Sequence, residues 1–134
     1  MEMTFTFPGG ARVDGQVGRF IIPTDQPPDA TAPSPFTLFL ASIGACAGVY
    51  VQSFCRRRSI PTEGIRIVQR NQTRPDGMVE RVELVVELPP DFPERYRDAV
   101  IRAADQCTVK QHLEHPPVIA VRATVGEPEA VGTL

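Results

Sequence analysis

The chain has 134 residues, of which 42% are hydrophobic and 22% charged, and its formal net charge is −2. The length predicts a single domain over residues 1–134, and the globular composition excludes disorder over the whole length. The near-neutral charge argues against a nucleic-acid partner. No charged and apolar leader opens the sequence, and three cysteines are too few, and odd in number, for a disulfide scaffold. We therefore expect a cytoplasmic protein whose cysteines are free, catalytic or metal-bound.

Short strands followed by a loop are predicted at the start of the chain. Residues 3–7 alternate apolar and polar side chains, as a half-buried strand does, and the Pro-Gly-Gly run at 8–10 is expected to end that strand. Residues 11–22 predict one or two further short strands. Residues 23–35 are rich in proline and poor in large apolar side chains, so they predict an ordered or semi-rigid loop.

A long helix is predicted from Pro35 to about Arg58, with Ser34 as its N-cap. Nearly every face of this helix is apolar, which is typical of a helix buried at a protein centre or in a membrane. The uncharged stretch from Pro35 to Phe54 is long enough to span a bilayer. Its polar residues, and the strands predicted around it, favour the core helix of a soluble domain, and we expect no membrane partner.

The second half of the chain is predicted to hold a hairpin of two strands, two helices, a last strand and a mobile tail. In chain order these elements cover residues 64–73, 78–88, 91–106, 108–114, 118–124 and 126–134. Strands, a long helix, a hairpin and further helices in this order predict an α+β fold with a mostly antiparallel sheet.

Two cysteines are candidates for redox chemistry. Cys46 lies in the middle of the long helix and Cys107 ends the apolar stripe of the second helix, so the two could meet in the core. When two thiols meet, one thiolate can attack an oxidant and become a sulfenic acid, and the other can condense with it to a disulfide. The alternative is that both only pack, as buried free cysteines usually do. Cys55 lies about 180° around the helix from Cys46 and is predicted to pack only.

A nucleophilic thiolate needs a cation or hydrogen-bond donors that lower its pKa. No Arg, Lys or His lies within one helical turn of Cys46, so an activating charge must come from elsewhere in the fold or from a second subunit. Arg12 and Arg19 are the candidates, with exposed surface arginines as the alternative. His112 and His115 lack two further ligands at metal-site spacing, and we expect no metal site.

Three sequence motifs resemble the OsmC/Ohr family. The run from Ser34 to Gly48, Ser-Pro-Phe-Thr-Leu-Phe-Leu-Ala-Ser-Ile-Gly-Ala-Cys-Ala-Gly, resembles the family's helix motif. The run that begins Cys107-Thr-Val-Lys resembles the second family motif, in which a cysteine closes a helix. Pro8–Asp14 resembles the glycine turn before the family's second strand. The resemblance covers about residues 3–125.

This resemblance implies an intertwined homodimer, in which antiparallel sheets wrap around two long central helices. It also implies a peroxiredoxin-like thiol peroxidase that reduces organic hydroperoxides in oxidative stress and needs no cofactor. By carry-over, Cys46 is the peroxidatic cysteine and Cys107 the resolving cysteine. Arg12, offset by one residue, is the closest match to the arginine that assists the thiolate. The expected reductant is a dithiol, with a lipoyl-type donor in one branch of the family.

One position departs from the family pattern. The family places a glutamate one or two residues after the proline that opens the helix, where this chain has Phe36 and Thr37. That glutamate orients the arginine, so its loss bears on peroxidase activity and not on the fold. Phe36 and Thr37 are therefore expected to line a pocket for an apolar substrate or ligand. The alternative function is an OsmC-like protein without efficient peroxidase activity, which binds an apolar small molecule at the dimer interface or senses redox state.

Overall fold

The computed structural model describes residues 1–126. Contacts divide the described residues into two compact units, one of residues 1–39 and 118–126, the other of residues 40–117. The described residues form a three-stranded and a two-stranded antiparallel sheet, three α-helices and one 3₁₀ turn. The predicted α+β class is confirmed.

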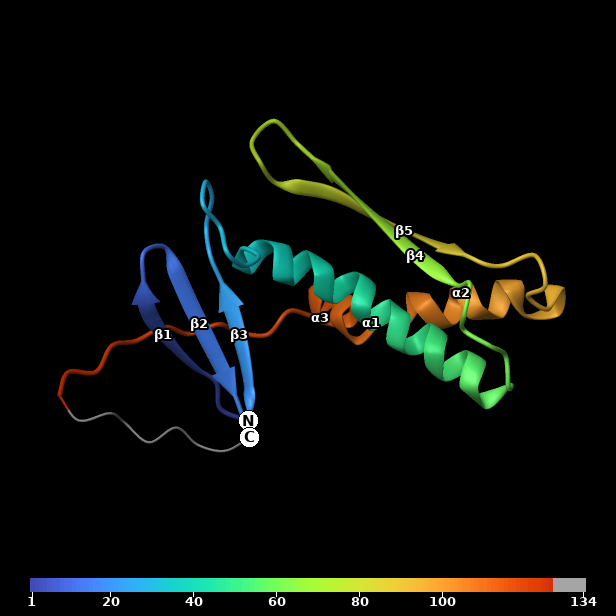
Figure 1. The fold of residues 1–134 in the computed structure, drawn as a ribbon, viewed down its shortest axis with the longest axis horizontal. Helices are drawn as coiled ribbons and strands as arrows, with labels where there is room; N and C mark the ends of the chain where they lie inside the picture. Colours follow the sequence, from blue (N-terminus) through green and yellow to red (C-terminus); the bar gives the residue numbers. More distant parts are fainter. Residues whose placement is uncertain (127–134) are drawn as a thin grey trace. The chain divides into compact units, whose positions relative to one another are not determined.

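The first unit is built on a meander of three short strands (Figure 1). Its strands are β1 (Thr4–Gly9), β2 (Arg12–Val17) and β3 (Phe20–Thr24). The first strand ends within the Pro-Gly-Gly run at 8–10, as predicted, but it continues through Pro8 to Gly9. β1 is an edge strand with a register shift between Thr6 and Gly9, and an edge or bulged strand tolerates a residue that has no N–H to donate.

The proline-rich loop after β3 is organised by Asp25. The Asp25 carboxylate accepts hydrogen bonds from the Gln26 N–H at 2.8 Å and from the Thr31 N–H and hydroxyl, each at 2.9 Å. The Thr31 N–H first, and then the other two donors, hold the pKa of Asp25 below its ordinary value. The predicted ordered loop is confirmed, with one carboxylate serving three donors.

The long helix α1 spans Pro35–Arg57, one residue short of the predicted end. The Ser34 hydroxyl accepts a hydrogen bond from the Thr37 N–H at 3.1 Å, which is the predicted cap. The expectation of a helix buried on nearly every face is wrong within one chain, since Val49 is 60% exposed. The helix α1 is long and apolar enough to cross a membrane, but core helices of soluble proteins meet the same criterion of length and composition. The buried stripe consists of Ile43, Ala47, Val51, Phe54 and Cys55.

The second unit contains most of α1, a strand hairpin and two further helices (Figure 1). The predicted helix over 91–106 is shorter than expected and begins as a 3₁₀ turn after Pro93, because a residue before proline is disfavoured in helical conformation. In place of that helix the structure has η1 (Glu94–Tyr96) and α2 (Arg97–Asp105). The remaining elements match their predictions within two residues, and they are β4 (Arg66–Thr73), β5 (Val79–Glu87) and α3 (Thr108–Glu114).

The core of the second unit lies where α1, α2 and the hairpin meet. Gly44 lets α1 approach β4 closely, because a Cβ there would lie 2.6 Å from the side-chain oxygen of Gln69. The Gln69 amide in turn donates to the Leu40 carbonyl of α1 at 2.9 Å. The buried core residues are Ala47, Val51, Phe54, Cys55, Phe92, Val100 and Ala104.

The strand predicted over 118–124 is wrong within the single chain. These residues belong to no helix or strand of the part that the structure describes, and Val118 is 96% exposed. A strand requires a neighbouring strand that bonds its N–H and C=O groups, and neither sheet of the described residues includes 118–124. The predicted tail lies, apart from Gly126, outside the described residues.

Candidate functional site

Cys46 and Cys107 come from different elements and meet in the second unit. Cys46 is half-buried in the middle of α1, and Cys107 is the buried residue that caps the N-terminus of α3. Their thiols lie within hydrogen-bonding reach of each other, and both cysteines are free. The structure therefore brings together the two cysteines that the sequence singled out.

Hydrogen-bond donors surround the sulfur of Cys46. Burial raises the pKa of this thiol, but hydrogen bonds from the Val109 N–H, the Cys107 thiol, and the N–H and hydroxyl of Thr108 together outweigh burial. The pKa of Cys46 therefore lies below its ordinary value. The N–H groups belong to the first turn of α3, where they have no partner within the helix and carry partial positive charge. This arrangement stabilises a thiolate through dipoles.

Cys107 is in the opposite electrostatic situation. Burial raises its pKa, as does the neighbouring Cys46, and this outweighs the N–H groups of Lys110 and Val109. Its thiol has two acceptors, the Ile43 carbonyl at 3.8 Å and the sulfur of Cys46. One proton serves one acceptor at a time, and an ionised acceptor binds more strongly. We therefore expect the Cys107 proton to turn toward Cys46 when Cys46 ionises.

The sequence interpretation missed the donors at Thr108 and Val109. It sought an activating cation near Cys46, whereas the donors belong to α3, which begins directly after Cys107. The signal was present, because the short helix over 108–114 was predicted at that position. The N-terminus of that helix could have been proposed beside whatever Cys107 contacts.

The two sulfurs open into different cavities of the second unit. Cys46 lines a cavity of about 610 Å³ between α1 and α2, whose walls include Tyr50, Phe54 and Ala103. Cys107 lines a cavity of about 420 Å³, whose apolar wall comes mainly from β5 and α2. Each of the two cysteines thus adjoins a cavity of its own.

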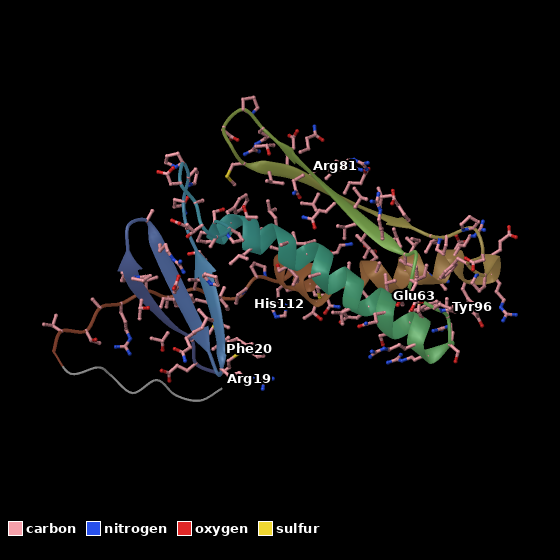
Figure 2. The ribbon with its side chains drawn as sticks, viewed as in Figure 1. Arg19, Phe20, Glu63, Arg81, Tyr96 and His112 are labelled. Carbon is pink, nitrogen blue, oxygen red and sulfur yellow. The ribbon has the colours of Figure 1, made fainter. Side chains whose placement is uncertain are left out.

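The candidate arginines belong to the first unit. The Arg12 guanidinium on β2 donates to both carboxylate oxygens of Asp14, at 2.9 and 3.0 Å. Arg19 lies over the ring of its neighbour Phe20 at 5.3 Å, at the turn between β2 and β3 (Figure 2). The role of Arg12 beside Cys46 stays a prediction.

Phe36 and Thr37, the expected pocket residues, lie in the first turn of α1. The exposed Phe36 ring stacks on Phe39 with centroids 5.7 Å apart. The Thr37 hydroxyl shares a 2.9 Å hydrogen bond with the Ser34 hydroxyl as part of the helix cap. Neither residue lines the cavities of Cys46 and Cys107, and their role as a substrate pocket stays a prediction.

Cys55 has the packing role predicted for it. It is fully buried in the core of the second unit, and burial raises the pKa of its thiol. Within residues 1–126, no three His, Cys, Asp or Glu side chains are gathered as a metal ion would require. Cys46 and Cys107 thus remain the candidate residues for thiol chemistry.

A family model described as OsmC-like protein matches residues 28–122, a span that includes both of these cysteines. The chain belongs to the OsmC family. No curated protein matches this OsmC-like chain. The match does cover the whole second unit, so the site described above lies inside the family domain.

Solved structures of similar fold agree with the family assignment. One, from Psychrobacter arcticus, is assigned provisionally to the osmotic stress and detoxification response; it is 19% identical, with 81% of this chain and 85% of that chain covered and a TM-score of 0.69. An OsmC-like protein from Mycoplasma pneumoniae is 15% identical, with coverages of 86% and 87% and a TM-score of 0.64. An OsmC-like protein of unknown function from Vibrio cholerae is 11% identical, with coverages of 84% and 92% and a TM-score of 0.57. At these identities the likeness shows the fold alone.

Proposed function

We propose that this protein is a thiol-dependent peroxidase that reduces organic hydroperoxides, with Cys46 as the peroxidatic and Cys107 as the resolving cysteine. The observation that carries the proposal is the contact between a half-buried thiol of lowered pKa and a buried thiol of raised pKa. Thiolate is the nucleophilic form of cysteine, so Cys46 is the sulfur prepared to attack.

The chemistry proceeds in two steps. The Cys46 thiolate attacks the terminal oxygen of the hydroperoxide and the O–O bond breaks. The alkoxide takes up a proton and leaves as an alcohol, and Cys46 becomes a sulfenic acid. Cys107 then attacks the sulfenic sulfur, its proton leaves with the hydroxyl as water, and a disulfide joins the two residues. A dithiol reductant restores both thiols by exchange and ends as its own disulfide.

The contrast between the two thiols assigns these roles. Cys46 ionises first and reacts first, whereas Cys107 keeps its proton until the sulfenic acid has formed beside it. The raised pKa of Cys107 also preserves it from direct oxidation, which follows thiolate character and exposure. A homodimer in the cytoplasm is part of this proposal, and so is Arg12 as the arginine that assists the Cys46 thiolate.

The second candidate function is binding of an apolar small molecule, or redox sensing, without efficient turnover. The observation that favours it is the exposed aromatic pair Phe36 and Phe39, at the position where the family glutamate is replaced. In this case the thiols would be oxidised slowly or not at all by hydroperoxides.

Counting thiols separates the two functions. Reduced protein receives one equivalent of cumene hydroperoxide, beside the variants Cys46→Ser, Cys107→Ser and Cys55→Ala. We expect rapid loss of two of the three thiols in the parent, of both remaining thiols in Cys55→Ala, and no rapid loss in Cys46→Ser. Cys107→Ser should stop at a sulfenic acid that dimedone traps. Peroxide consumption that survives Cys46→Ser overturns the peroxidase, and three persistent thiols in the parent support the binding function.

A further inference from the structure

A hydrogen bond links α1 to the first residue of α3 beside the reacting sulfur. Tyr50 lies one helical turn after Cys46 on α1, and its hydroxyl is 2.7 Å from the hydroxyl of Thr108. The Thr108 hydroxyl is also one of the groups that lower the pKa of the Cys46 thiol by hydrogen bonding. All three residues line the same cavity of the second unit. Two hydroxyl groups therefore stand in series behind one thiol.

The donor direction along this series follows from the chemistry of the groups. A hydroxyl donates one hydrogen bond and accepts others, whereas a thiolate only accepts. When Cys46 is ionised, the Thr108 hydroxyl must therefore donate to the sulfur. The Thr108 oxygen is then open to accept the proton of the Tyr50 phenol. Donors aligned in this way polarise one another, which strengthens the bond to the charged atom.

Thr108 needs such a support because of its place in the fold. Its side chain is exposed, so without a partner the hydroxyl is free to rotate toward water. It also begins a helix of only seven residues, which has little packing of its own to hold its first turn in place. The Tyr50 phenol lies on the face of α1 that carries Cys46, since residues four apart are neighbours on a helix.

We propose that Tyr50 is a positioning residue of the thiol site, which holds the Thr108 hydroxyl and the first turn of α3 against the Cys46 sulfur. The inference rests on the proposed function only in taking Cys46 as the reacting sulfur. Tyr50 does not touch the sulfur itself in this scheme. It acts through Thr108, so that neutral hydroxyl groups of the second unit stabilise the thiolate.

The test is the pH dependence of Cys46 alkylation by iodoacetamide in the reduced protein, followed by mass spectrometry of the Cys46 peptide. In Tyr50→Phe we expect the rate profile to move to higher pH, with a rate at neutral pH lowered roughly two- to tenfold, the range of one neutral hydrogen bond. Thr108→Val should lower the rate at least as much, because it removes the direct donor. Thr108→Ser should keep the parent profile, because it retains the hydroxyl.

The matched control is Tyr96→Phe, at the second of the two tyrosines in the chain. The Tyr96 ring packs edge-on against Phe54 with centroids 5.9 Å apart, and it does not line the Cys46 cavity. Figure 2 shows Tyr96 well away from His112, which lies one turn beyond Thr108 on α3. We expect Tyr96→Phe to leave the alkylation profile unchanged.

Two results would overturn the positioning role. One is an unchanged profile in Tyr50→Phe; the other is an equal loss in Tyr50→Phe and Tyr96→Phe, which would indicate general loosening. Should Tyr50→Phe fail to fold, the test is the comparison of Thr108→Val with Thr108→Ser. Equal alkylation profiles in these two variants would contradict the proposal. Alkylation needs no peroxide, so the two proposals can fail separately. If the Tyr50→Phe profile shifts but the parent does not reduce peroxide, only the proposed function is wrong. If the parent reduces peroxide but the Tyr50→Phe profile does not shift, only this inference is wrong.

Discussion

The thiol of Cys46 draws its acidity from donors that differ in how easily they can be removed. The N–H groups of Val109 and Thr108 belong to the backbone and persist in any side-chain variant, whereas the thiol of Cys107 and the hydroxyl of Thr108 do not. Each side-chain donor is therefore open to an individual test. The backbone donors still lower the pKa of Cys46 in every such variant, so no single substitution of a donor should return Cys46 to the reactivity of a free cysteine.

Replacing Cys107 by alanine should raise the pKa of Cys46, because the hydrogen bond from the Cys107 thiol is one of the contacts that lower it. Alkylation of Cys46 below its pKa then slows by a factor of about two to ten. The matched variant is Cys107→Ser, whose hydroxyl can still donate and which should stay near the parent profile. The measurement is the alkylation rate as a function of pH. A profile that is the same in Cys107→Ala and in the parent contradicts this account of the low pKa.

Val100 on α2 should be among the costliest positions to truncate in the second unit. Its side chain is 0% exposed and belongs to the core with α1 and the hairpin. Val100→Ala leaves a cavity there and should lower the free energy of unfolding by roughly 1–3 kcal/mol. The neighbour Ile101 is 46% exposed, so Ile101→Ala removes more atoms and should still cost less. Urea denaturation followed by circular dichroism checks the order, and a larger cost at Ile101 would contradict it.

At the scale of the element, the loop between β3 and α1 depends on the ionised form of Asp25. Hydrogen bonds from Thr31 and Gln26 lower the pKa of Asp25 in the folded chain. A carboxyl group with a lowered folded pKa stabilises the fold fully above its unfolded pKa of about 3.9, and that stabilisation is lost as the pH falls through the folded value. Acidification should therefore loosen this loop.

Asp25→Asn should remove that pH dependence. Between about pH 5 and about pH 2, the unfolding midpoint of the parent should fall more than the midpoint of the variant, because only the parent loses an ionised acceptor. Asp29→Asn, at an exposed aspartate of the same loop, should follow the parent. The measurement is thermal unfolding at a series of pH values. Parallel curves for the parent and Asp25→Asn would show that Asp25 does not stabilise the loop through its charge.

At the scale of the whole molecule, the single chain leaves much apolar surface in water. Soluble monomers rarely expose large contiguous apolar patches, and such patches mark interaction sites. The buried residues of α1 form one stripe, although the helix is apolar on nearly every face. The exposed large side chains include Phe7, Phe20, Ile21, Val49, Val118, Ile119 and Val121. These residues support the proposed homodimer, in which a second copy would cover them.

We expect the protein to sediment as a dimer, and Ile119→Lys to weaken that dimer. Ile119 is 83% exposed in the segment that was predicted as a strand, so the substitution disturbs little within one chain. A charge placed in an apolar interface is costly to bury. Thr124→Lys, in the same segment, serves as the control and should have the smaller effect. Analytical ultracentrifugation decides, and a parent that is monomeric at every concentration removes the homodimer from the proposal.

The sequence by itself determined the elements whose signals are local. The cap at Ser34 and the apolar run after it predicted α1 within one residue of its end. Alternating side chains on both sides of a turn that contains Gly77, with φ 89°, predicted the hairpin of β4 and β5. Apolar positions on two helices marked Cys46 and Cys107 as a pair. Each of these signals is contained within a few turns of chain, where propensity and periodicity act directly.

Only the tertiary structure decided what surrounds the Cys46 sulfur and which surfaces stay uncovered. The pKa of a thiol depends on dipoles within a few ångströms, and these come from Thr108 and Val109 on another helix. The strand expected over 118–124 is absent from the single chain for a related reason, because a short apolar run indicates a tendency to pair but does not identify the partner. Local sequence patterns therefore determined which residues could form the site, and long-range packing determined which groups surround each of them.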